Sequence, residues 1–209
     1  MDLSGLPYAV VPMTLEDVPT VSEVERAVFT MPWSAGAFRY ELAHNHSATY
    51  LVLRYTPWAP KRRGIPRQVV WRLPHPDEID RSILGYGGLW MMLDEGHICT
   101  LGIRAEWRGR GLGELLLWSL IQAAHQRGAS IVTLEVRESN AVAQGLYRKY
   151  GLEVAGRRKG YYTDNHEDAL IMSIEGIDTP DYQARLAHKA KSLRQHLLAF
   201  GTQPPVSAQ

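Results

Sequence analysis

The sequence predicts an α/β fold: a mixed central sheet of about six to seven strands flanked by helices, with an extra helix at the C-terminus. Short runs of β-branched and apolar residues alternate with longer segments in which apolar residues recur at helical spacing. One glycine-rich turn, Arg108-Gly109-Arg110-Gly111-Leu112-Gly113, opens directly into such a helical segment. The predicted strands are residues 8–11, 50–55, 83–92, 97–103, 131–136, 152–157 and 169–174.

Two helices are predicted between the first two strands. The segment from Thr14 to Asp17 resembles a capping box and opens a helix that carries four valines toward the core. Residues 31–34 interrupt that helix, and Ser34 is placed to cap a second one. Further along, residues 94–96, Asp-Glu-Gly, are typical of a hairpin turn.

The second half alternates between helix and strand. The helix after the glycine turn is expected to end at Arg127 and Gly128, and Gly151 is expected to stop a short helix over residues 140–150. The strand at 131–136 is so apolar that we expect it to be buried on both faces. A last helix is predicted over 181–200, with one apolar stripe formed by Leu186, Ala190, Leu193 and Leu197.

We therefore divide the chain into one domain, residues 1–176, and a C-terminal helix with a loose tail, residues 177–209. Residues 56–80 are rich in proline and arginine, which indicates an extended insertion within the domain. Residues 69–71 are the one part of it that could form an edge strand.

Composition sets broad limits on function. The 209 residues carry a net charge of +1, which gives no indication of nucleic-acid binding. Cys99 is the single cysteine, so no internal disulfide can form, as is usual in a reducing cytosol. No apolar run is long enough for a membrane helix, and no signal peptide is recognisable. We expect a cytoplasmic protein with no membrane partner.

The glycine-rich turn is a candidate anion site. Glycines leave backbone N–H groups accessible, and the start of a helix adds unpaired N–H groups and the positive end of its dipole. Such a site most often binds phosphate.

Glu135 lies within the apolar run Val132-Thr133-Leu134-Glu135-Val136, where a carboxylate is costly unless it is paired or used. We expect partial burial to raise its pKa into the range of a general base. The alternative is a structural glutamate that pairs with Arg137 or Arg148.

Tyr147 follows Asn140 by seven residues, two helical turns, so both side chains can face one side. A tyrosine hydroxyl can donate a proton to a departing thiolate. The alternatives are a core tyrosine for Tyr147 and a helix N-cap for Asn140.

At this point the sequence resembles a known family. The pattern Arg108-x-x-Gly111-x-Gly113 is similar to the pyrophosphate loop of the GNAT N-acetyltransferases. A more specific block, residues 134–152, resembles the bacterial ribosomal-protein-alanine N-acetyltransferase branch of that family, and the resemblance covers about residues 8–174. Segments 32–34, 94–98, 161–162 and 167–172 fit the same branch.

The resemblance implies acetyl-CoA as cosubstrate and no metal. The backbone of Leu101, Gly102 and Ile103 would hydrogen-bond the pantetheine arm, and Asn140 would contact the cofactor. The pyrophosphate would be held by a loop that Arg108 opens and whose amides come from Gly109, Arg110, Gly111, Leu112, Gly113 and Glu114.

The resemblance also implies catalytic roles. Glu135 would act as general base through a water molecule, and Tyr147 would protonate the CoA sulfur. The peptide groove would be lined by Trp33, Trp90, Tyr161 and Tyr162. The amine would attack the thioester directly, so Cys99 is interpreted as a small buried apolar residue and not as a nucleophile.

The implied activity is acetyl transfer to the N-terminal α-amine of a protein, with a ribosomal protein as the implied substrate. The alternatives are a family member that acetylates lysine ε-amines or a small-molecule amine, and a non-catalytic acyl-CoA sensor. The presence of both Glu135 and Tyr147 argues against the sensor. The oligomeric state is left as monomer or homodimer.

Three features depart from the family pattern: the insertion at 56–80, Gly151-Leu152 where relatives often have Gly-Phe, and the added C-terminal helix. The basic residues of the insertion, among them Lys61 and Arg62, raise the idea of contact with ribosomal RNA. A solvated charged loop is the simpler interpretation.

Overall fold

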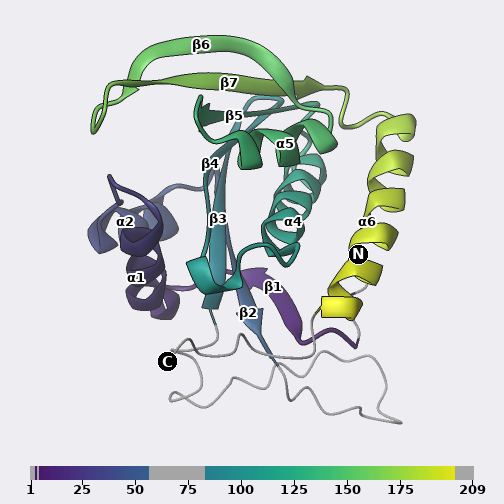
Figure 1. Cartoon of the computed structure of the whole chain (residues 1–209), viewed down its shortest axis with the longest axis horizontal. Helices are drawn as coiled ribbons and strands as arrows, with labels where there is room; N and C mark the ends of the chain where they lie inside the picture. Colours follow the sequence, from purple (N-terminus) through teal and green to yellow (C-terminus); the bar gives the residue numbers. More distant parts are fainter. Residues whose placement is uncertain (1–2, 4, 57–82, 201–209) are drawn as a thin grey trace.

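The structure is a computed structural model that describes residues 3, 5–56 and 83–200. Its centre is a seven-stranded sheet in the order β1-β2-β3-β4-β5-β7-β6 (Figure 1). Neighbouring strands are antiparallel except for β4 and β5, which are parallel, so the sheet is mixed as predicted. The strands are β1 (Tyr8–Pro12), β2 (Ala48–Tyr55), β3 (Ile83–Met92), β4 (Glu95–Ile103), β5 (Ile131–Arg137), β6 (Glu153–Tyr162) and β7 (Glu167–Glu175).

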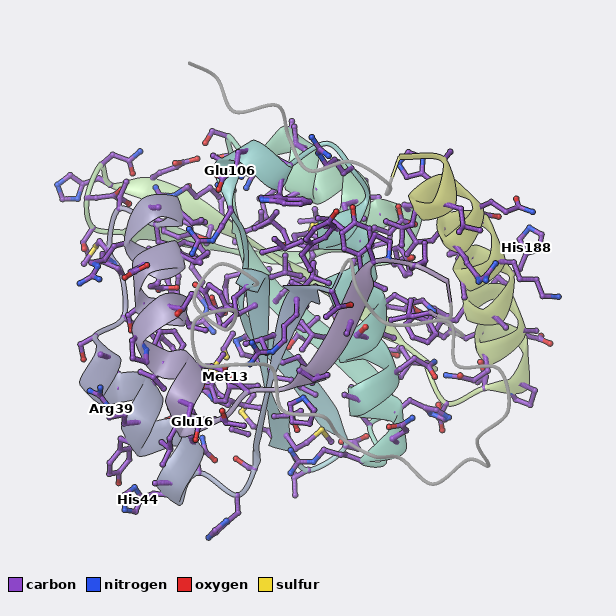
Figure 2. All side chains as sticks on the ribbon, turned by 90° about the horizontal axis from the view of Figure 1, so that it is seen from below. Met13, Glu16, Arg39, His44, Glu106 and His188 are labelled. Atoms are coloured by element: carbon purple, nitrogen blue, oxygen red, sulfur yellow. The ribbon has the colours of Figure 1, made fainter. Side chains whose placement is uncertain are left out.

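Helices cover both faces of this sheet. On one face lie α1 (Val18–Val28) and α2 (Ala35–His44), and on the other lie α4 (Leu112–Gln126), α5 (Ala141–Lys149) and α6 (Pro180–Phe200) (Figure 1). Short 3-10 turns, η1 (Leu15–Asp17) and η2 (Ala105–Trp107), precede α1 and α4. Side chains fill the space between the sheet and the helices on each side (Figure 2). The predicted fold class is confirmed, including the added C-terminal helix.

The parallel strands β4 and β5 separate partway along their length. They pair from Glu95 with Ile131 to Ile98 with Leu134 and no further. Beyond that point β4 continues to Ile103 and β5 to Arg137. Backbone groups at the end of β4 therefore face an opening in the sheet instead of a neighbouring strand.

Local capping signals in the sequence are confirmed. The backbone N–H of Thr14 donates to Asp17 Oδ2 at 2.9 Å, and the Ser34 hydroxyl oxygen accepts from Ala37 N at 3.1 Å. Asn140 caps α5 by accepting from Ala143 N at 3.1 Å. These bonds form between residues three apart, which is why the sequence alone could predict them.

The β3–β4 turn differs from the prediction. Glu95 and Gly96 already belong to β4, so the turn consists of residues 93–94. Leu93 adopts a left-handed conformation with φ of 59° and is 99% exposed. The two-residue turn shifts the start of β4 and lets Glu95 join the sheet.

The expectation that β5 is buried on both faces is wrong. Val132, Leu134 and Val136 are buried, whereas Thr133 and Glu135 are only partly buried. The buried set packs against α4, which also covers one face of β4. Glu135 therefore points to the opposite face, because successive strand residues alternate.

Helix α6 packs along α4. Its predicted apolar stripe, Leu186, Ala190, Leu193 and Leu197, is buried. Trp118 Nε1 of α4 donates to Leu186 O at 3.2 Å, and Tyr182 OH donates to Tyr150 O at 3.0 Å. Most of the insertion at 56–80 and the tail at 201–209 lie outside the described residues.

Candidate active site

The glycine-rich loop connects β4 to α4. Gly109 and Gly111 have φ of +75° and +81°, conformations that L-residues adopt only with strain. The first intrahelical bond of α4 runs from Leu115 N to Gly111 O at 3.0 Å, so the amides of residues 112–114 have no intrahelical acceptor. Arg108 Nε donates to Ile103 O at 3.1 Å and fastens the loop to the end of β4. The predicted loop residues are thus together at one helix start.

Glu114 brings a carboxylate close to this anion site. Lys149 Nζ lies 2.6 Å from Glu114 Oε1, and Tyr150 OH donates to the same oxygen at 3.0 Å. Burial and the neighbouring carboxylate raise the pKa of Tyr150, so its hydroxyl keeps the proton that it donates. Because Lys149 neutralises Glu114, the carboxylate does not cancel the positive character of the loop.

Leu101, Gly102 and Ile103 lie at the end of β4, beside the opening between β4 and β5. Asn140 begins α5, but its side-chain oxygen already serves as the helix cap. The structure thus supports the alternative interpretation of Asn140 as a cap, and a cofactor contact would use another atom of its side chain.

Glu135 lies where β4 and β5 part, with a side chain that is 10% exposed. Its Oε2 is 3.2 Å from His97 Nε2, and its Oε1 is 3.0 Å from Arg158 Nη2. The hydrogen bond from His97 outweighs burial, and with Arg158 nearby it lowers the pKa of Glu135. The expectation of a raised pKa is wrong, because burial acts together with two cationic or donor groups.

The two arginines suggested as partners of Glu135 lie elsewhere. Arg137 pairs with Asp164 at 2.8 Å and Glu167 at 3.1 Å, and Arg148 donates to Gln144 at 3.2 Å. The arginine that pairs with Glu135, Arg158, comes from β6.

His97 is the site residue that sequence reasoning missed. Its Nδ1 lies 3.0 Å from Thr133 Oγ1, and the Thr133 hydroxyl in turn donates to Glu95. A continuous polar chain therefore runs from Glu95 through Thr133 and His97 to Glu135. The signal was present in the sequence, since Glu95, His97, Thr133 and Glu135 alternate with apolar residues along two strands.

Tyr147 approaches the opening from the other face. It is 8% exposed and belongs to the cluster formed by α4, α5 and the buried side of β5. Burial raises its pKa to about 12, with Tyr162 adding to the shift. Within the described part of the chain its hydroxyl has no hydrogen-bond partner, so this is not a core tyrosine with a satisfied hydroxyl.

Tyr161 and Tyr162 are the last two residues of β6, and Tyr162 lies near Glu135 and Tyr147. Their rings lie 5.2 Å apart, and the Arg137 guanidinium lies 3.9 Å above the ring of Tyr162. Burial raises the pKa of Tyr162 to about 12, and Glu135 contributes to that shift. Tyr162 thus lies within electrostatic reach of both Glu135 and Tyr147.

Trp33 and Trp90 lie on the side of Glu135 where His97 is found. Their rings stack at 5.8 Å, and Trp90 also stacks on His97 at 6.2 Å. Trp90 Nε1 donates to Glu41 Oε2 at 2.9 Å, which fixes its ring. The result is a row of three rings, Trp33, Trp90 and His97, that ends at Glu135.

Cys99 is partly buried, with its sulfur and the ring of Tyr50 both beside Gly88. Burial raises the pKa of its thiol to about 12, so it carries no thiolate at neutral pH. Among the described residues, no three His, Cys, Asp or Glu side chains gather in a way that could hold a metal ion. Within the same residues, no helix has the length and apolar character needed to cross a membrane.

A pair of parallel strands that separate, an anion loop at the following helix start, and a carboxylate and a tyrosine on either side of the opening together define a coenzyme A-dependent acyltransferase. The chain belongs to the acetyltransferase (GNAT) family, whose model matches residues 19–152. The match ends before α6.

Relatives within this family share a more specific name. A protein of Bacillus subtilis (strain 168) is 40% identical over 162 residues, 78% of this chain and 91% of its own length, and its name assigns it provisionally as a ribosomal protein bS18-alanine N-acetyltransferase. The Escherichia coli (strain K12) protein with that name is 31% identical over 160 residues, 76% of this chain and 90% of its own.

Solved structures of acetyltransferases have a similar fold. The crystal structure of the Escherichia coli ribosomal-protein-S18-alanine N-acetyltransferase is similar with a TM-score of 0.62 at 25% identity, and covers 81% of this chain and 94% of that chain. The NatC complex bound to Gag peptide and CoA is similar in fold, with a TM-score of 0.60 at 18% identity over 81% of this chain and 99% of that chain.

Proposed function

We propose that this protein transfers the acetyl group of acetyl-CoA to the α-amine of an N-terminal alanine on a ribosomal protein, the substrate class for which its relatives are named. The observation that carries the proposal is the row of rings Trp33, Trp90 and His97, which leads to the carboxylate of Glu135 at the opening between β4 and β5. A ribosomal substrate would place the reaction in the cytoplasm.

The residues present fit acetyl-CoA. Two left-handed glycines and the free amides of α4 suit a pyrophosphate, and Lys149 compensates the charge of Glu114. We assign the pyrophosphate to the loop that Arg108 opens and to the amides of residues 109–114. The backbone of residues 101–103 would hydrogen-bond the pantetheine, and Asn140 would lie beside it.

Bound acetyl-CoA supplies a thioester, whose C–S bond is replaced by a C–N bond to the amine. A protein α-amine has an ordinary pKa of about 7.7–8.0, so only a modest base is needed to give the neutral form. Glu135 is ionised at neutral pH and accepts the proton of the amine through a water molecule. His97 and Arg158 hold the carboxylate in place.

Tyr147 supplies the proton that the CoA sulfur needs when the C–S bond breaks. A pKa of about 12 keeps its hydroxyl protonated throughout the working range. Because Glu135 and Tyr147 reach the opening from opposite faces of the sheet, base and acid do not compete for one proton. We assign Trp33 and Trp90 to one wall of the peptide groove and Tyr161 and Tyr162 to the other.

We propose the same division of the chain as the sequence predicts. Residues 1–176 would form the catalytic domain and residues 177–209 an appended helix and tail. The active species would be a monomer or a homodimer, which sedimentation of the full chain would distinguish.

Peptide substrates test the function. We expect turnover of acetyl-CoA with a peptide that begins with alanine and whose lysines are blocked, with the acetyl group found on the α-amine by mass spectrometry. The matched peptide has a blocked N-terminus and free lysines. Activity on that second peptide alone would overturn the proposal in favour of a lysine acetyltransferase.

A further inference from the structure

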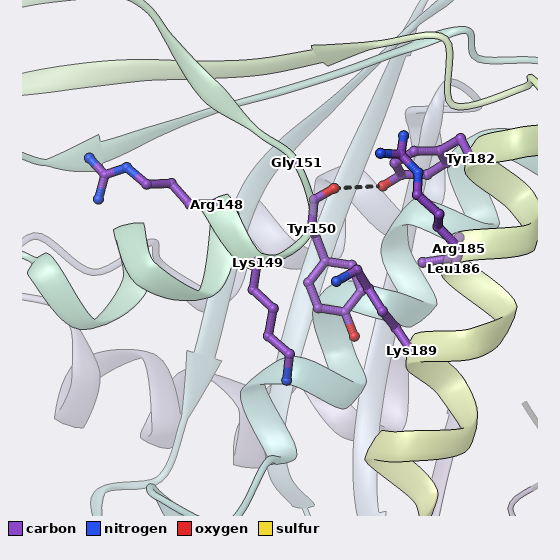
Figure 3. A pocket seen from close by; sticks show the side chains of 8 residues that line it. All are labelled: Arg148, Lys149, Tyr150, Gly151, Tyr182, Arg185, Leu186 and Lys189. Atoms are coloured by element: carbon purple, nitrogen blue, oxygen red, sulfur yellow. Dashed lines mark hydrogen bonds between the residues drawn. The ribbon is translucent and has the colours of Figure 1, made fainter.

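A basic pocket lies between the end of α5 and helix α6 (Figure 3). It encloses about 190 Å³, and four of its eight lining residues are cationic while none is acidic. The lining residues are Arg148, Lys149, Tyr150, Gly151, Tyr182, Arg185, Leu186 and Lys189. The Arg148 side chain points away from the other cations (Figure 3), and Lys149 is paired with Glu114, so Arg185 and Lys189 define the charge of the pocket.

Aromatic rings position the two cations of α6. The Arg185 guanidinium lies 5.4 Å from the ring centre of Tyr182, and Lys189 Nζ lies 5.7 Å from that of Tyr150. Both rings are buried. Within residues 3, 5–56 and 83–200, neither cation forms an ion pair. Two such charges beside buried rings attract an anion more strongly than charges that are fully surrounded by water.

The pocket and helix α6 each contact the segment that carries the glycine-rich loop. Lys149 and Tyr150 both contact Glu114, which directly follows Gly113. At the other end of α6, a Cβ atom added to Gly111 would lie 2.9 Å from His196 Cδ2 and 3.3 Å from Leu193 Cδ1. Helix α6 thus packs directly against the loop to which we assign the pyrophosphate.

We propose that Arg185 and Lys189 bind the 3′-phosphate of coenzyme A, beside the ion pair of Lys149 with Glu114, so that α6 is part of the cosubstrate site. This inference rests on the proposed use of acetyl-CoA. In coenzyme A one ribose separates the pyrophosphate from the 3′-phosphate, and the pocket residues Lys149 and Tyr150 contact Glu114, the last residue assigned to the pyrophosphate loop. A phosphate monoester carries up to two negative charges and three acceptor oxygens, which suits several converging cations.

Helix α6 lies outside the part of the chain that matches the family. The family match ends at residue 152, so Arg185 and Lys189 lie outside it, whereas Lys149 lies inside. The appended helix would therefore add two cofactor contacts to those of the shared fold.

Binding of two ligands tests the proposal. Calorimetry measures the affinity of CoA and of 3′-dephospho-CoA for the full chain, for the double variant Arg185→Gln/Lys189→Gln and for the control Lys191→Gln. Glutamine keeps most of the side-chain length and removes the charge. Lys191 is an exposed lysine of the same helix that does not line the pocket.

We expect the full chain to bind CoA at least about tenfold more tightly than 3′-dephospho-CoA, as charge-assisted phosphate contacts would give. The double variant should lose this preference by weakening CoA alone, and Lys191→Gln should keep it. Equal affinity of the full chain for both ligands would overturn the inference and leave the proposed function standing. Failure to bind either ligand would contradict the proposed function itself.

A second measurement needs no variant. The 3′-phosphate of free CoA, like other phosphate monoesters, loses its second proton with a pKa of about 6. If Arg185 and Lys189 bind it, ³¹P NMR of bound CoA should show this pKa lowered. An unchanged value would contradict the proposal even if the double variant failed to fold.

Discussion

His97 Nε2 lies 3.2 Å from Glu135 Oε2, at the point where the parallel strands β4 and β5 cease to pair. The two residues come from neighbouring strands and occupy the same face of the sheet. Their contact decides the chemistry of the site, because it makes Glu135 a stably ionised carboxylate instead of a buried carboxyl group with a raised pKa.

Removing His97 should raise the pKa of Glu135. The hydrogen bond from His97 is the largest cause of its low value, and burial opposes it. In a His97→Leu variant, ¹³C NMR of the Glu135 carboxyl should show a higher titration midpoint than in the unmodified protein. His188→Leu is the control, since His188 projects from α6 into solvent (Figure 2). An unmoved midpoint would show that Arg158 alone holds the carboxylate.

Glu135→Gln should lower kcat/KM for an alanine peptide by about 10²–10⁴, the usual contribution of a positioned base. Affinity for CoA should stay unchanged, because the loop and the β4 backbone are untouched. Steady-state kinetics measures kcat/KM, and calorimetry measures the affinity for CoA. A Glu135→Gln variant that turns over as fast as the unmodified protein would contradict the role of Glu135 as general base.

The same carboxylate links stability to pH. A folded-state pKa below the ordinary value contributes stability above the unfolded pKa, and this contribution is lost as pH falls through the folded value. The stability advantage that the ionised Glu135 gives the unmodified protein over Glu135→Gln should therefore be constant at neutral pH and shrink in acid. Urea unfolding at pH 7 and at pH 4 measures it.

Tyr147→Phe should lower kcat by at least about 10²-fold and leave the melting temperature nearly unchanged. The hydroxyl forms no hydrogen bond within the described part of the chain, so its removal strands no partner. With a pKa of about 12, Tyr147 should also cause no loss of activity below pH 10 in the unmodified protein. A large fall in melting temperature would instead indicate a structural role.

Gly111→Ala and Gly109→Ala form a matched pair. Both glycines have positive φ, so each alanine costs about 1 kcal/mol of strain or more. A Cβ at Gly111 would also meet His196 of α6, whereas none of the atoms described lies within 4 Å of one at Gly109. Chemical denaturation should show the larger loss for Gly111→Ala, and equal losses would argue against tight packing of α6 on the loop.

Glu25→Gln should stabilise the protein at alkaline pH. Glu25 is 2% exposed, and burial raises its pKa to about 7 although Trp33 N donates to it at 2.9 Å. A raised carboxyl pKa means that stability falls as pH rises from the unfolded value to about 7, by about 3 kcal/mol at most. The gain of the variant should appear at pH 8 and vanish near pH 4. A gain that does not depend on pH would have another origin.

The sequence determined the local features of this protein. The caps at Ser34 and Asn140, the glycine loop and the stripe of α6 depend on residues a few positions apart, where spacing and side-chain type are sufficient. The block around Glu135 and Tyr147 also indicated the reaction class through its resemblance to a family. Nothing local could show which side of β5 faces solvent, because that depends on what α4 covers.

Only the tertiary structure decided the partners and the charge of the site. Glu135 is held by His97 of β4 and Arg158 of β6, strands that are distant in sequence, and these contacts reversed the expected direction of its pKa. The placement of α6 against Gly111 is of the same kind. A pKa and a packed interface both depend on groups brought together by folding, whose identity cannot be read from the spacing of neighbours along the chain.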